Sequence, residues 1–139
     1  MKARTISDFE GLWQLSRRID HADGTQARFD GQAHWAAAKG GLTYTETGQM
    51  LIANAAPMPA QRRYFWRADL SVWFDDGRFF HHVPGGGGAT RHWCDPDLYC
   101  GDYAFKDWPA FTVEWTVSGP RKSYVMLSHY QRASEIDLR

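Results

Sequence analysis

Apolar and polar residues alternate along most of the chain, and turn signals separate the alternating segments. Segment 111–118, FTVEWTVS, shows this most clearly, because its apolar residues occupy every second position. A period of two is typical of a strand with one buried face, and no segment has the spacing of a long amphipathic helix. The pattern predicts about ten strands, at 9–20, 26–37, 42–53, 61–69, 71–74, 79–83, 90–94, 98–105, 111–118 and 123–132.

Consecutive antiparallel strands form a sheet with two edges, and closure into a barrel protects both of them. We therefore expect an all-β fold, a single antiparallel up-and-down β-barrel of about ten strands with an interior ligand cavity. The length of 139 residues fits one domain, residues 1–139. A jelly roll or an open sandwich is the structural alternative.

Composition argues against several classes of partner. Lys plus Arg and Asp plus Glu each number 16, so no overall field attracts nucleic acid or an anionic membrane. The first residues form no apolar leader and no later run is long enough to span a bilayer, which predicts a cytoplasmic protein with no membrane partner. In that compartment Cys94 and Cys100 are expected to be free thiols. A homodimer is compatible with the sequence.

Side chains two positions apart share a strand face, so the face richer in bulky apolar residues is expected to point inward. This rule assigns a set of candidate ligand contacts to the interior: Arg17, Arg62, Tyr64, Trp66, His81, His92, Cys94, Tyr99, Tyr103, Trp115, Tyr124, Ser128, Tyr130 and Arg132. Its arginines outnumber the carboxylates assigned to the interior, and a buried charge without a partner is costly. The set predicts a small anionic or polar-aromatic ligand, unless bulges turn some arginines to solvent.

Motifs at both ends of the chain are similar to those of known barrels. Gly11-Leu12-Trp13 resembles the Gly-x-Trp signature of lipocalin-like barrels, in which the Trp plugs the closed end and an Arg from the final strand, here in Tyr130-x-Arg132, lies over it. The segments RRYFWR, FDDGRFFH, HWCDPDLYCGDYAF and WTVSGPRKSY resemble a bacterial family of unknown function, DUF6314, over nearly the whole chain. This resemblance implies a small lipocalin-like or nitrobindin-like barrel and no established activity.

An enzyme with the same fold is the first alternative to a binding protein. His81 or His92 could act as the acid or base, with Asp97 orienting the imidazole ring and Tyr99 donating a proton. Such a set suits isomerase or dehydratase chemistry.

Carriage of zinc or haem is the second alternative. Zinc would require His81, His92 and Cys94 to converge from neighbouring strands. The resemblance to nitrobindin-like barrels implies haem held by a His from a late strand, and His129 is placed accordingly, although it lies on the face opposite Tyr130. The preferred interpretation, binding of a small molecule, needs neither a metal nor a cofactor.

Overall fold

The computed structural model describes residues 2–133. A single turn of helix, α1 (Ile6–Phe9), precedes ten strands in this part of the chain. The strands are β1 (Gly11–His21), β2 (Gln26–Ala38), β3 (Gly41–Ile52), β4 (Met58–Arg67), β5 (Ser71–Phe74), β6 (Phe79–His82), β7 (Gly88–Cys94), β8 (Asp97–Ala104), β9 (Phe111–Ser118) and β10 (Ser123–Arg132). Each predicted segment overlaps one of these strands, so the alternation located the strands correctly.

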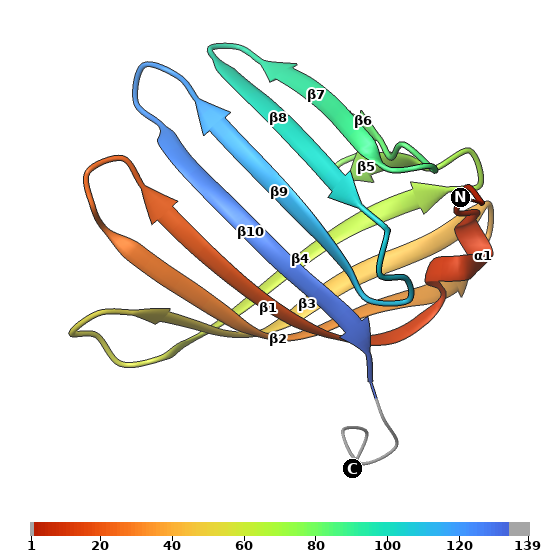
Figure 1. Cartoon of the computed structure of the whole chain (residues 1–139), viewed down its shortest axis with the longest axis horizontal. Coiled ribbons are helices and arrows are strands. Elements are labelled where there is room, and N and C mark those ends of the chain that lie inside the picture. The colour runs from red at the N-terminus through yellow and green to blue at the C-terminus, as the bar shows by residue number, and fades with distance from the viewer. Residues whose placement is uncertain (1, 134–139) are drawn as a thin grey trace.

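All ten strands belong to one antiparallel sheet, in the order β6-β5-β4-β3-β2-β1-β10-β9-β8-β7. Consecutive strands are neighbours in the sheet except for β6 and β7, and the first and last strands also pair, with Trp13 opposite Arg132. The sheet therefore curls into the predicted up-and-down barrel (Figure 1), and its two edges, β6 and β7, meet without backbone pairing in the described residues. The barrel is nearly closed.

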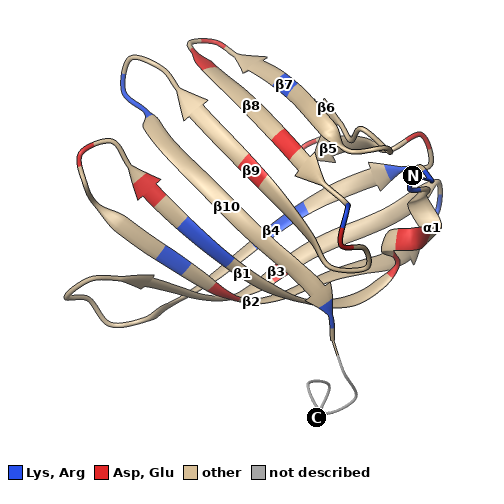
Figure 2. Cartoon of the chain, in the orientation of Figure 1, with Lys and Arg blue, Asp and Glu red and all other residues tan. Residues whose placement is uncertain are grey.

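The inward faces predicted for the most regular strands are confirmed. Buried side chains occupy every second position in both β1 and β9, at Trp13, Leu15, Arg17, Ile19, Phe111, Val113, Trp115 and Val117. Polar residues between them face outward, where Arg18 pairs with Asp20 on β1 and both signs of charge are interspersed (Figure 2).

Strand β6 departs from strict alternation. The pattern predicts that Phe79 and His81 share the inner face, but the Phe79 side chain is 46% exposed and Phe80 is buried. The register with β5 explains the error, because Val72 lies opposite His81 whereas Trp73 lies opposite Phe79, two residues back. This bulge places the adjacent residues Phe80 and His81 both inside the barrel.

Aromatic rings fill the end of the barrel next to α1. Phe9 and Trp13 are fully buried there, and the Trp13 indole donates a hydrogen bond of 2.8 Å to the Phe9 carbonyl oxygen. The Phe9 ring is in contact with five other rings, those of Trp35, Trp66, Phe105, Trp108 and Phe111. This plug is apolar and closed, so any ligand must lie beyond it.

Arg132 covers the plug from outside. Its guanidinium lies 4.1 Å from the centroid of the Trp13 ring and donates hydrogen bonds to the carbonyl oxygens of Asp8, at 2.6 Å, and Glu10, at 2.7 Å. Gly11 lies beside it with a φ of +123°, a conformation that favours glycine, and a Cβ there would come within 2.8 Å of the Arg132 guanidinium. The arrangement matches the plugging Trp and covering Arg that the lipocalin-like resemblance implies.

Candidate functional site

Beyond the plug, the barrel holds a cavity of about 370 Å³. A volume of this size is typical of sites for small molecules. Most of the predicted ligand contacts lie on its wall: Arg17, Arg62, Tyr64, Trp66, His81, Tyr99, Tyr103, Trp115, Tyr124, Ser128 and Tyr130. A second hollow, of about 510 Å³, lies on the outer surface beside segment 104–112 and is lined by outward residues such as Gln14 and His129.

Three predicted contacts are not on the cavity wall. Arg132 follows the last inward residue of β10 and lies at the plugged end, where Trp13 already fills the interior, so Arg132 does not line the cavity. His92 packs between the barrel edges, with its ring 5.3 Å from that of Phe80. Cys94, at the end of β7, is a half-buried free thiol.

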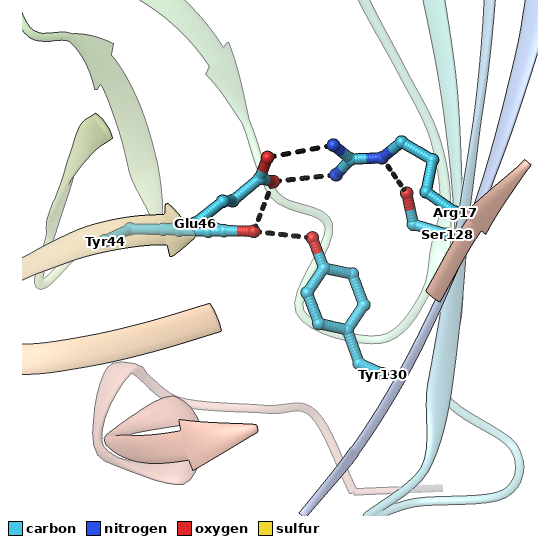
Figure 3. A network of polar contacts seen from close by, with 5 residues as sticks. All are labelled: Arg17, Tyr44, Glu46, Ser128 and Tyr130. Carbon is cyan, nitrogen blue, oxygen red and sulfur yellow. Dashed lines mark hydrogen bonds and ion pairs between the residues drawn. The ribbon is translucent and has the colours of Figure 1, made fainter. Parts of the chain in front are cut away.

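An ion pair crosses the base of the cavity (Figure 3). The Arg17 guanidinium donates to both carboxylate oxygens of Glu46, at 2.8 and 2.7 Å, and its Nε donates to the Ser128 hydroxyl at 2.7 Å. Burial alone favours a neutral carboxyl, but the hydrogen bonds and charge of Arg17 outweigh it and lower the pKa of Glu46. Both groups are therefore charged, and each neutralises the other.

Two tyrosines extend this network across the barrel. The Tyr44 hydroxyl donates to Glu46 Oε2 at 2.6 Å and lies 2.8 Å from the Tyr130 hydroxyl. Burial, followed by the nearby Glu46 charge, raises the pKa of Tyr44 well above its usual value, and burial raises that of Tyr130 to about 12. Both phenols are consequently protonated at neutral pH.

Glu46 is the residue that sequence reasoning missed. Segment 42–53 has Leu42, Tyr44, Met50 and Ile52 on one parity, but Glu46 interrupts this apolar set, and a carboxylate is normally expected at the surface. Glu46 is nevertheless two residues from Tyr44 and four from Leu42, and all three are buried. The shared parity with Leu42 is the signal that could have placed Glu46 inside.

Two further cations line the cavity, Arg62 and Lys122. Lys122 Nζ lies 3.3 Å from both the Asp97 carboxylate and the Tyr99 hydroxyl. Figure 2 shows the two turns that carry this pair, the acidic β7–β8 turn and the basic β9–β10 turn, at the same end of the barrel. By contrast, no carboxylate among residues 2–133 forms an ion pair with Arg62, which lies opposite Glu46 in the β3–β4 register.

His81 is buried among aromatic rings on the cavity wall. Its Nε2 lies 2.8 Å from the Tyr103 hydroxyl, and its Nδ1 has no hydrogen-bond partner among the described residues. Burial, with smaller effects from the charges of His92 and His82, lowers the pKa of His81 to about 3. The imidazole is therefore neutral at physiological pH.

The contacts predicted for an acid–base enzyme and for a zinc or haem carrier differ from those in the structure. Asp97 pairs with Lys122 and not with a histidine, so the predicted orienting contact is missing among residues 2–133. In the same part of the chain, no three His, Cys, Asp or Glu side chains are grouped to hold a metal ion, and His81, His92 and Cys94 do not form such a set. His129 is exposed on the outer face of β10.

Residues 9–132 match the model of a family of unknown function, DUF6314. The chain belongs to this family. The DUF6314 barrel is also similar to a solved structure, the S-type phycobiliprotein lyase CPES from Guillardia theta, with a TM-score of 0.65 and 9% sequence identity over 94% of this chain and 91% of that one. At this identity the likeness shows the fold alone.

No curated protein matches the sequence of this DUF6314 chain. Within residues 2–133, no helix has the length and hydropathy needed to cross a lipid bilayer.

Proposed function

We propose that the cavity of this DUF6314 protein binds a small aromatic anion. The balance of charge on the cavity wall carries the proposal. Three cations, Arg17, Arg62 and Lys122, line the cavity together with one carboxylate, Glu46. Glu46 is engaged by Arg17 through two hydrogen bonds and Lys122 is paired with Asp97, so of the three cations Arg62 alone forms no ion pair with a carboxylate of residues 2–133.

Arg62 is the group that we expect to meet the anion. Burial opposes its charge, but Tyr64 and Glu46 outweigh burial and raise its pKa, so Arg62 is always protonated. Lys122 already faces Asp97, whereas Arg62 has no ion pair with a carboxylate in the described chain. A planar guanidinium binds a carboxylate or sulfonate through paired hydrogen bonds.

The cavity walls favour an aromatic skeleton for the ligand. The Phe80 ring stacks on Phe74 at 4.6 Å and on Trp115 at 5.2 Å, with interplanar angles of 16° and 22°. These stacked rings form part of the cavity wall, and such an apolar aromatic surface favours contact with a planar aromatic molecule. The phycobiliprotein lyase with a similar fold is an enzyme by name, but in this chain Asp97 pairs with Lys122, which leaves acid–base chemistry with less support than binding.

A matched pair of fluorescent probes tests the proposal. 1-Anilinonaphthalene-8-sulfonate carries a sulfonate, and N-phenyl-1-naphthylamine is the same skeleton without it. We expect the native protein to bind the sulfonate about tenfold more tightly, since a charge-assisted contact in a partly buried site contributes about 1.5 kcal/mol. Native mass spectrometry beforehand checks that no copurified molecule, including haem, occupies the cavity.

Neighbouring arginines on β4 provide the matched variants. Arg62→Gln should remove the preference for the sulfonate and leave binding of the neutral probe unchanged. Arg63→Gln alters the next residue, which is exposed on the outer face opposite Thr45, and should behave as the native protein. Equal effects of the two substitutions on sulfonate binding would mean that the anion binds elsewhere. A copurified haem that fills the cavity would overturn the proposal in favour of haem binding.

A further inference from the structure

Hydrogen-bond donation in the Tyr130–Tyr44–Glu46 chain runs in one direction (Figure 3). Glu46 is ionised and can only accept, so the 2.6 Å contact uses the single hydroxyl hydrogen of Tyr44. The hydrogen in the 2.8 Å contact between the tyrosines must then come from Tyr130. Tyr130 has no hydrogen left for a ligand, and its oxygen offers only lone pairs.

Unused donors lie on the same part of the cavity wall. Ser128 accepts from Arg17 Nε and keeps its own hydroxyl hydrogen. Trp35 is 1% exposed, and its indole N–H has no acceptor among the described residues. The Trp35 ring lies 5.7 Å from that of Tyr130 and stacks on Tyr44 at 4.5 Å. A buried donor without an acceptor costs about 1–3 kcal/mol, so a ligand atom that accepts is favoured here.

We infer that the ligand is an aromatic hydroxy acid, with its hydroxyl at the base of the cavity and its acid group at Arg62. This inference rests on the proposed function and specifies the ligand class. A hydroxyl group can donate to Tyr130 and accept from Ser128 or Trp35, which matches the acceptor and the donors present. An ether or a ketone can only accept, and an ammonium would place a positive charge beside Arg17.

Three cinnamic acid derivatives separate the two ends of the ligand. 4-Hydroxycinnamate has both groups, 4-methoxycinnamate lacks the hydroxyl hydrogen, and 4-hydroxycinnamamide lacks the negative charge. Isothermal titration of the native protein should show 4-hydroxycinnamate binding about tenfold more tightly than either analogue, because 4-methoxycinnamate offers no hydrogen to the buried Tyr130 oxygen and the amide offers no charge to Arg62. 4-Hydroxybenzoate serves as a shorter member of the same class.

Tyr130→Phe provides the test at the base of the cavity. It retains the ring, which stacks on Phe111 at 4.6 Å, and removes the acceptor. We expect the roughly tenfold preference for 4-hydroxycinnamate over 4-methoxycinnamate to disappear, so that both bind with about equal affinity, while the affinity for 4-methoxycinnamate stays unchanged. Tyr124→Phe is the control, since Tyr124 also lines the cavity but lies outside the network, and it should keep the preference.

The outcomes distinguish this inference from the proposed function. Equal binding of the hydroxy and methoxy acids, both weakened by Arg62→Gln, would overturn the inference and leave the anion site in place. Equal binding of 4-hydroxycinnamate and its amide would overturn the anion site. If neither hydroxy acid binds while the sulfonated probe does, the cavity accepts aromatic anions of another class, and the inference is wrong.

Discussion

The two ends of the barrel interior are built from the same strands but differ in chemistry. At the plugged end, Trp13 and Phe9 are fully buried and the indole N–H is satisfied by the Phe9 carbonyl. At the cavity end, four residues further along β1, Arg17 is buried with Glu46, and His81 Nδ1 on the wall has no partner among residues 2–133. One end is built mainly from apolar rings, whereas the other holds a buried ion pair and a histidine nitrogen without a partner among the described residues.

This difference separates the source of stability from the source of specificity. Burial of large rings favours folding by about 25 cal/mol per Å² of apolar surface, so the plug contributes directly to stability. A buried ion pair roughly offsets its own desolvation and can often be replaced by apolar residues without loss. The Arg17–Glu46 pair is therefore better explained by the polar surface that it presents to a ligand.

Substituting one tryptophan at each end should give the largest contrast. Trp13→Ala is expected to lower the free energy of unfolding by about 4 kcal/mol, because its ring is enclosed on all sides. Trp115→Ala should cost about 2 kcal/mol, since that ring borders an existing cavity. Urea denaturation followed by circular dichroism measures both.

Probe binding should show the opposite ranking. The folded Trp13→Ala protein should retain its affinity for 1-anilinonaphthalene-8-sulfonate, whereas Trp115→Ala should weaken binding by loss of a flat wall. Equal losses of stability in the two variants, or loss of binding in Trp13→Ala alone, would contradict the division between the ends.

The alternation of apolar and polar residues predicted whether a side chain points into the barrel better than it predicted how far along the barrel axis that side chain lies. It placed Trp13 and Arg17 inside by the apolar parity of β1, and Tyr130 by taking the aromatic face of β10 as interior, and all three are buried. It could not show that Arg132, of the same parity, lies past the plug, because depth depends on how strands are staggered around the barrel.

Two other details depended on pairing between distant strands. The bulge opposite β5 reversed the orientation of Phe79, and nothing in FFHH itself marks the extra residue. Glu46 shares the buried parity of Leu42, but a carboxylate without a known partner is normally assigned to the surface, and its partner Arg17 is far away in sequence. The ten strands were thus predictable from local pattern, whereas the charge balance of the cavity was not.

Glu46→Gln tests the cost of the polar end. The substitution leaves Arg17 buried without a counter-charge, and we expect the free energy of unfolding to fall by about 3 kcal/mol. The double variant Arg17→Met with Glu46→Leu removes both charges and should recover most of the lost stability. It should also abolish the preference for 4-hydroxycinnamate over 4-methoxycinnamate. Urea denaturation and isothermal titration give the two readings. A double variant as unstable as Glu46→Gln would show that the ion pair itself holds the fold.

The smallest effect concerns pH, and it arises from His81, the buried histidine on the cavity wall. The unfolded chain binds a proton at His81 near its ordinary pKa of 6.5, whereas the folded protein does so only at about 3. Because the unfolded state binds more protons between these values, stability falls as pH decreases through this window, by up to about 1.4 kcal/mol per pH unit. His92, whose pKa is lowered first by burial and then by the charge of Arg78, acts in the same direction.

Urea midpoints measured from about pH 7 to about pH 5, above the range in which carboxylates titrate, isolate the histidines. His81→Gln should flatten this slope, and His129→Gln, on the exposed face of β10, should leave it unchanged. An unaltered slope in His81→Gln would mean that His81 is protonated equally easily in the folded and unfolded chains, and that water already reaches the cavity wall.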